Sequence, residues 1–296
     1  MADYYLSRIK IASIALILLI FLIIAINLPK FKEEAYLSPD YQVRGVVTNL
    51  WLDSSKLERL EEHRINYLFV DIGELNKNGI VNSSSEEIIS FLERVATYEN
   101  SKGYLFIVLP YSRILMEEYN FSEQFEDNLI ISYGNLIKLG FDGVYLDIEE
   151  VSIERREDYL EFVKKLRTNL TDENYLSVHS GILDNVWTKD FYEDISETAD
   201  LIVIPSYGVG TLNEEEYRTY VSNQVKQLAK LDPYTKAKLV LEIPSHRNPP
   251  ETIENSLLAY NKALDEIENT KFIGTSIYSE WTMDGNEWKN YKEFIE

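Results

Sequence analysis

The chain has 296 residues, of which 50 are Asp or Glu and 29 are Lys or Arg, so its formal net charge is −21. Such acidity argues against nucleic acid as a partner, and against an anionic membrane surface, because both are bound through clustered Lys and Arg. The content of 45% hydrophobic residues excludes a disordered chain. The absence of Cys excludes thiolate sites, and the presence of only three His argues against a metal centre built from His. We therefore expect an acidic globular protein without a metal or cofactor.

Residues 11–28 read IASIALILLIFLIIAINL, a run without any charge. At 1.5 Å per residue, a helix of this length would span most of the roughly 30 Å hydrocarbon core of a bilayer. A cleaved signal peptide is the alternative, but its apolar region usually has about 7–15 residues and ends at a small-x-small site, which this run lacks. The sequence therefore predicts a single transmembrane helix at residues 11–28, after a short tail at residues 1–10.

The charges that flank this run give little information on its orientation. Arg8 and Lys10 precede it and Lys30 and Lys32 follow it, so positive charge is almost equal on the two sides. A short N-terminal tail most simply remains inside while the bulk of the chain crosses. We expect a single-pass protein of the cell membrane that contacts the lipid bilayer, with a linker at residues 29–40 and the main domain on the extracellular side.

Residues 41–296 have the usual length of a (βα)₈ barrel, which is about 250 residues. Short apolar runs rich in Val, Ile, Leu and aromatic residues recur along this part of the chain and are typical of buried parallel strands. They begin near Val43, Ile65, Tyr104, Phe141, Tyr175, Leu201, Lys238 and Phe272. The sequence thus predicts eight strands.

Longer charged segments with helical spacing lie between these strands. They cover residues 53–64, 84–100, 126–140, 153–170 and 252–270, with a last helix at Asn286–Ile295. Several begin with Asp, Ser or Thr and end near Gly or Asn, as capped helices do. This alternation predicts an α/β fold, a single (βα)₈ TIM-type barrel, and active sites of such barrels lie at the C-terminal ends of the strands.

The fourth predicted strand, residues 141–149, reads FDGVYLDIE and carries the strongest functional signal. Alternate side chains of a strand face opposite sides, so Tyr145, Asp147 and Glu149 would point into the barrel. Like-charge coupling raises the pKa of one of two close carboxyl groups, and Glu149, nearer the mouth, would then serve as a general acid. A purely structural role, in which both acids bond to neighbouring strands, is the alternative.

This strand resembles the fourth strand of the family 18 glycoside hydrolases, the chitinase-like barrels, which typically reads D-G-x-D-x-D-x-E and ends in the catalytic acid. Asp142, Gly143, Asp147 and Glu149 match the motif, and Glu149 occupies the position of the acid. Weaker similarity extends along the domain. It covers residues 65–81, 202–210, 238–247 and 274–281. The chain is therefore similar to a divergent member of this family.

The resemblance implies a retaining glycosidase that acts on a polysaccharide containing N-acetylhexosamine. In that mechanism the N-acetyl oxygen of the substrate attacks the anomeric carbon, so the protein supplies no nucleophile, unlike the usual two-carboxylate scheme. Glu149 would protonate the glycosidic oxygen, Asp147 would orient the acetamido group and stabilise its developing positive charge, and Tyr207 would hydrogen-bond the acetamido oxygen.

Further residues near the predicted strand ends are candidates for contact with the substrate. They are Asp142, Tyr145, His179, Glu242, Tyr278 and Trp281. Tyr145 stands where the family has the middle Asp of its motif, and Tyr278 where it has a closing Trp, with Trp281 three residues further on. These two departures support a second hypothesis, a glycan-binding barrel without turnover.

Glu242, at the end of the seventh predicted strand, supports a third hypothesis. A glycosidase of another family, similar to the polygalactosaminidases, would pair Glu149 with Glu242, and retaining enzymes hold two such carboxyl groups about 5–5.5 Å apart. The resemblance to family 18 places Glu242 where Gly usually lies, as a neighbour of the site. A Ser nucleophile has little support, because the chain has no G-x-S-x-G segment.

Overall fold

The computed structural model describes residues 42–76, 78–115, 122–210, 213–231, 235–245, 248–268 and 270–295, which belong to one compact unit. None of the helices within these ranges is long and apolar enough to cross a bilayer. This finding contradicts the predicted location in the cell membrane and gives no support to contact with lipid. The predicted transmembrane segment itself, residues 11–28, lies outside the described residues.

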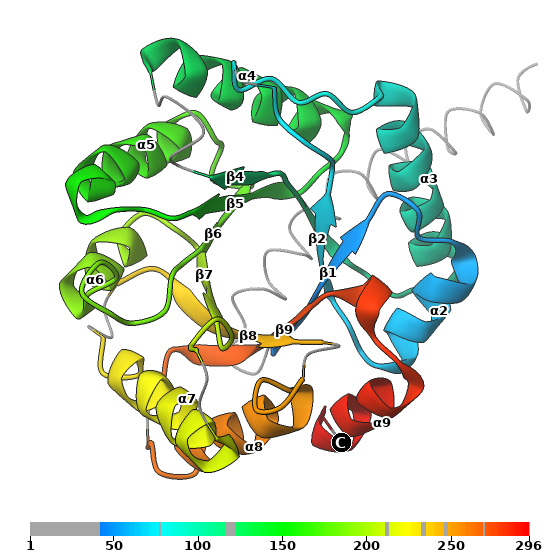
Figure 1. Ribbon diagram of the computed structural model, residues 1–296. Helices are drawn as coiled ribbons and strands as arrows, with labels where there is room; N and C mark the ends of the chain where they lie inside the picture. Colours follow the sequence, from blue (N-terminus) through cyan, green and yellow to red (C-terminus); the bar gives the residue numbers. More distant parts are fainter. Residues whose placement is uncertain are drawn as a thin grey trace, which may run out of the picture. The chain divides into compact units, whose positions relative to one another are not determined.

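All strands of the described residues run parallel in one sheet, in the order β3-β2-β1-β9-β8-β7-β6-β5-β4. They are β1 (Val43–Asn49), β2 (Tyr67–Asp71), β3 (Ile107–Tyr111), β4 (Arg113–Leu115), β5 (Gly143–Glu149), β6 (Tyr175–His179), β7 (Leu201–Pro205), β8 (Lys238–Pro244) and β9 (Phe272–Tyr278). Ser112 alone separates β3, which pairs with β2, from β4, which pairs with β5. Together β3 and β4 form the third strand of an eight-stranded barrel, and the ring closes through them (Figure 1).

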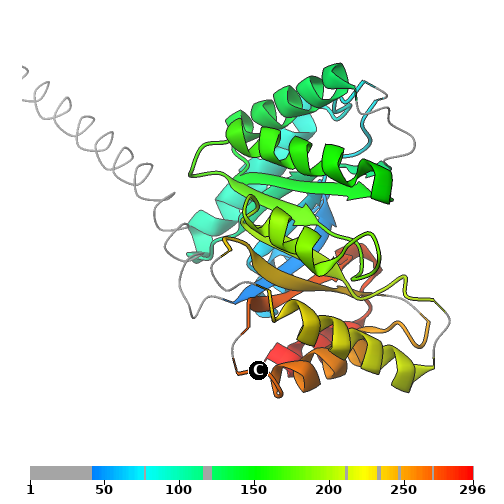
Figure 2. The ribbon, with the colours of Figure 1, turned by 90° about the vertical axis from the view of Figure 1, so that its left-hand side faces the viewer.

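Helices surround this ring of strands (Figures 1 and 2). They are α2 (Ser54–Glu62), α3 (Ser85–Lys102), α4 (Glu123–Leu139), α5 (Arg156–Thr168), α6 (Lys189–Ser196), α7 (Glu214–Leu228), α8 (Ile253–Leu264) and α9 (Gly285–Ile295), with 3₁₀ helices η1 (Ile153–Arg155) and η2 (Glu280–Thr282). The side chains of Asp53, Ser84 and Ser122 accept hydrogen bonds from the first turns of α2, α3 and α4, as N-caps do. The predicted α/β barrel is confirmed, with α6 and α7 as the crossovers for which the sequence pattern gave no range.

Side chains on the strands alternate between the barrel interior and the layer beneath the helices. On β5, Val144, Leu146 and Ile148 belong to the apolar layer that packs on the helices. Tyr145 and Asp147 are buried on the opposite face of the same strand. The alternation predicted for this strand is therefore correct, and it directs the acidic side chains into the barrel.

Aromatic rings fill the barrel interior beneath these acids. The ring of Tyr145 lies 4.5 Å from that of Phe69 and 5.5 Å from that of Tyr111, measured between centroids. Gly45 makes room for this packing, since a Cβ atom at that position would lie 2.8 Å from Phe69. The rings occupy the middle of the barrel, so the polar side chains gather at the C-terminal ends of the strands.

Candidate active site

Asp147 and Glu149 occupy alternate positions at the C-terminal end of β5. Asp147 is enclosed, with 5% of its surface exposed, whereas the side chain of Glu149 is 31% exposed at the mouth of the barrel. Burial raises the pKa of Asp147 to about 7; the positive charge of His179 opposes this shift, and the carboxylates of Glu149 and Glu242 add to it. The strand end thus holds one enclosed carboxyl group and one that a ligand can reach.

His179, the last residue of β6, lies between two buried carboxyl groups. Its Nδ1 is 3.4 Å from Oδ1 of Asp147, and its Nε2 is 3.2 Å from Oε2 of Glu242 on β8. Burial by itself lowers the pKa of His179, but the facing carboxylates outweigh burial and raise it to about 9. At neutral pH the imidazolium therefore links the acid on β5 to the acid on β8.

Tyr207, which follows β7, adds a hydroxyl group to this cluster. Its Oη donates a hydrogen bond of 2.5 Å to Oε2 of Glu242, and its ring stacks on that of Tyr278 with 5.7 Å between centroids. Burial and the carboxylate of Glu242 raise the pKa of Tyr207 well above its usual value, so the phenol remains protonated. The structure therefore brings Tyr207, Glu242 and Tyr278 together with the β5 acids.

Arg113 on β4 is a site residue that the sequence motifs did not indicate. Its guanidinium nitrogen Nη2 is 2.5 Å from Oε2 of Glu149, and it lies opposite Asp147 in the register of the two strands. The carboxylate of Glu149 raises the pKa of Arg113 in turn. Both side chains are partly exposed, and such ion pairs are worth about 0–1 kcal/mol. A ligand at the mouth could therefore displace this pair.

Two members of the motif-like segment lie away from the mouth. Tyr145 is fully buried in the aromatic interior, where its ring centroid is 6.3 Å from that of His179. Asp142 precedes β5 and lies at the opposite end of the strand from Glu149. Its carboxylate accepts a hydrogen bond from the backbone N–H of Val108, which ties β3 to the start of β5. The structure therefore does not bring Asp142 to the other predicted site residues.

A cleft of about 680 Å³ opens over the C-terminal ends of β1 and β2. Its walls include Trp51, Asp71 and Trp281. Trp51 is 76% exposed and Trp281 is 43% exposed, so both side chains are open to a ligand in the cleft. The ring of Trp281 lies 6.5 Å from that of Tyr278, which stacks on Tyr207, so one wall of the cleft adjoins the aromatic pair beside Glu242.

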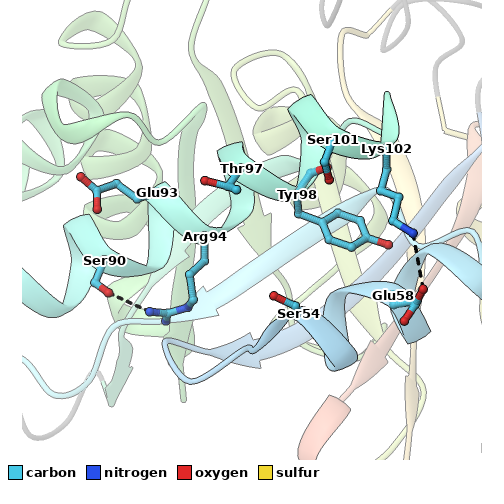
Figure 3. A pocket seen from close by; sticks show the side chains of 9 residues that line it. All are labelled: Ser54, Glu58, Ser90, Glu93, Arg94, Thr97, Tyr98, Ser101 and Lys102. Carbon is cyan, nitrogen blue, oxygen red and sulfur yellow. Dashed lines mark hydrogen bonds and ion pairs between the residues drawn. The ribbon is translucent and has the colours of Figure 1, made fainter.

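Another cavity, of about 460 Å³, lies between α2 and α3 in the outer layer (Figure 3). Arg94 donates hydrogen bonds to the carbonyl groups of Leu50 and Leu52, and Lys102 pairs with Glu58. These bonds join the two helices and the loop between β1 and α2, so we assign this cavity a structural role. In the part of the chain that the structure describes, no cluster of three or more His, Asp or Glu is placed to hold a metal ion.

Comparison with known proteins places the fold. No protein-family model and no curated protein sequence matches the chain. A class V chitinase from Pseudomonas fluorescens Pf-5 superimposes with a TM-score of 0.60 at 12% identity, over 86% of this chain and 100% of that one. A GH18 chitinase from Pseudoalteromonas aurantia gives a TM-score of 0.56 at 12% identity, over 84% and 99%. The spore cortex-lytic enzyme SleL of Bacillus megaterium QM B1551 gives 0.58 at 13%, over 87% and 75%. At such identities the likeness establishes a shared fold, and the predicted resemblance is confirmed at that level.

Proposed function

We propose that this chitinase-like barrel is a glycoside hydrolase that cleaves a polysaccharide containing N-acetylhexosamine. The observation that carries the proposal is the pair Asp147 and Glu149 at the C-terminal end of β5, one enclosed and the other open to a ligand. Barrels of this kind hold their catalytic groups at these strand ends. In the motif that β5 resembles, the same two positions orient the acetamido group and supply the acid.

In this mechanism Glu149 protonates the glycosidic oxygen while the acetamido oxygen of the sugar attacks the anomeric carbon. Asp147 accepts a hydrogen bond from the acetamido N–H, and its negative charge stabilises the positive charge that develops on this group. Glu149 then removes a proton from the water that completes hydrolysis. Arg113 must leave Glu149 before the acid can work, and the low energy of a half-exposed ion pair permits this.

The cleft over the ends of β1 and β2, at the same end of the barrel as the carboxylates, supports a polymeric substrate. Its volume of about 680 Å³ is within the usual range of ligand sites, which is about 300–1,000 Å³. Trp51 and Trp281 offer exposed ring faces along it, and such faces stack on the apolar side of a sugar ring. When one sugar of the polysaccharide lies at Asp147 and Glu149, neighbouring sugars of the same polysaccharide would therefore contact these rings.

One observation favours glycan binding without turnover as a second candidate function. The guanidinium of Arg113 already contacts a carboxylate oxygen of Glu149, so the acid is engaged before a glycan arrives. The two-carboxylate mechanism with Glu242 has less support. Glu242 is 1% exposed, and its Oε2 faces both Tyr207 and His179, so it is poorly placed to attack a sugar.

Incubation of the full chain with chitin, peptidoglycan and galactosamine polymers tests the proposal, with reducing ends as the measured product. We expect release from an N-acetylated polymer, and a loss of about 10²–10⁴-fold in Glu149→Gln, which still binds that polymer. Glu150→Gln, at the exposed residue that directly follows β5, is the matched control and should retain activity. Full turnover by Glu149→Gln would refute the assignment of the acid, and binding without any released ends in the wild type would favour the second function.

A further inference from the structure

We propose that His179 is a positioning residue that holds a proton between Asp147 and Glu242 and thereby keeps Asp147 ionised and oriented. This inference rests on the proposed function. Tyr145 occupies the place of an acid in the motif-like segment, so Asp147 has no acidic neighbour on its own strand below it. In the structure the partner of Asp147 is an imidazole from the adjacent strand β6.

The positions of the two ring nitrogens constrain where protons reside. A neutral imidazole carries one N–H, so between two ionised carboxylates it would turn a lone pair toward one of them. An imidazolium donates at both nitrogens, toward Asp147 at 3.4 Å and toward Glu242 at 3.2 Å. A neutral imidazole with one protonated carboxyl group holds the same number of protons. The three groups therefore share two protons and carry one net negative charge.

The enclosure of both carboxyl groups strengthens this argument. Oδ1 of Asp147 and Oε1 of Glu242 are buried without a well-aligned hydrogen bond among the described residues. An enclosed carboxylate is costly unless a positive charge or donors compensate it. The imidazolium faces both acids at once and provides this compensation. Arg113, the other cation that acts on Asp147, is bonded to Glu149 at the mouth.

The groups around His179 favour its charged form. The titratable groups that act on the cluster lie on β3, β4, β5, β8, β9 and the segment after β7. They are Tyr111, Arg113, Tyr145, Asp147, Glu149, Tyr207, Glu242 and Tyr278. Three of them are carboxyl groups and one is a guanidinium, while the phenols remain neutral. The surplus of negative charge raises the pKa of His179. The imidazolium in turn lowers the pKa of Asp147 and so favours the anion that the positive acetamido group of the sugar needs, while its Nδ1 faces one of the Asp147 oxygens.

A readout that does not depend on activity tests whether the shared proton lies on the His179 ring. In the full chain, ¹⁵N spectra of the histidine rings are recorded against pH, and the His179 signals are assigned by their loss in His179→Asn. We expect a doubly protonated ring at pH 7, and a titration midpoint at least one pH unit lower in Glu242→Gln. His63, at the end of α2 outside the barrel, is the internal control and should be unaffected by this change. A neutral His179 ring at pH 7, or a midpoint that Glu242→Gln leaves unchanged, would overturn the inference.

The pH dependence of turnover distinguishes a positioning role of His179 from a purely structural role. We expect kcat of the wild type to fall on the alkaline side as His179 loses its proton, and this limb to move to lower pH in Glu242→Gln. A residue with only a structural role would leave the limb in place. An unmoved limb in a folded Glu242→Gln variant contradicts the inference. If the wild type cleaves no polymer, the proposed function fails, whereas the ring titration still decides whether the proton lies on His179.

Discussion

Tyr207 donates a hydrogen bond of 2.5 Å to Glu242, a carboxyl group that is 1% exposed. The resemblance to family 18 assigns Tyr207 to the acetamido oxygen of a substrate. In this chain the hydroxyl is instead directed to an acid that replaces a Gly of the family pattern. Tyr207 is therefore coupled to the buried cluster of Asp147, His179 and Glu242.

Substitution Tyr207→Phe tests this coupling. It removes a donor from a buried carboxylate while the ring can still stack on Tyr278, and such a loss costs about 1–3 kcal/mol. We expect the free energy of unfolding in urea to fall by this amount, and kcat on the cleaved polymer to fall at least tenfold. Tyr220→Phe, on a partly buried phenol of α7, is the control. Wild-type stability in Tyr207→Phe would contradict the hydrogen bond.

Substitution Arg113→Met releases Glu149 from its ion pair. Since a bound sugar must displace this pair, we expect KM for the polymer to fall by about two- to fivefold, which corresponds to about 0.5–1 kcal/mol. The surface pair of Arg155 and Asp158, 2.8 Å apart, offers the control variant Arg155→Met, which should leave KM unchanged. A rise in KM would instead indicate that Arg113 itself contacts the glycan.

Substitutions Trp51→Ala and Trp281→Ala test the cleft. An aromatic contact contributes about 0.5–1.5 kcal/mol, so each variant should bind the polymer about two- to tenfold more weakly in a sedimentation assay. The exposed residue Ile131 on α4 provides the control Ile131→Ala, which removes apolar surface from the outer layer. Equal binding of the polymer by all three variants would show that the glycan does not contact the cleft.

The stability of the fold should depend on pH through His179. Its folded pKa of about 9 is above the unfolded value of 6.5, so its proton stabilises the folded state. This contribution is complete below pH 6.5 and is lost as the pH rises through about 9. Unfolding in urea should therefore require about 1–3 kcal/mol less at pH 9.5 than at pH 6.5. The decrease should be smaller in His179→Asn, in which Asp147 still loses its proton in this range, and an equal decrease in that variant would assign the effect to other groups.

Asp142 provides a contrast within the motif-like segment. Asp142→Ala removes the acceptor of the Val108 N–H at the closed end of the barrel, which should cost about 1–3 kcal/mol of stability. Turnover of the folded variant should be unchanged, because this carboxylate lies at the opposite end of β5 from Glu149. A loss of turnover without a loss of stability would place Asp142 in the chemistry after all.

Local patterns account for the part of the structure that could be predicted. Alternation along a single strand is a property of neighbouring residues, so the orientation of Asp147 and Glu149 followed from the sequence. The same pattern could not identify their partners. Arg113 reaches Glu149 through strand register across 36 residues of sequence, and His179 reaches Glu242 across the interior of the barrel. Asp142 is the opposite case: it matches the motif, but its carboxylate joins β3 to the start of β5 instead of lying at the mouth.

The single-residue break at Ser112 has a consequence for the chemistry of the mouth. Arg113 faces the acids, whereas the next residue, Ile114, belongs to the apolar layer under the helices. Because side chains of a strand alternate, a break longer or shorter by one residue would exchange these two and turn a hydrocarbon toward Glu149. One residue inserted or deleted at the junction of β3 and β4 would thus replace Arg113 beside Glu149 with an apolar side chain, without changing any residue of the motif.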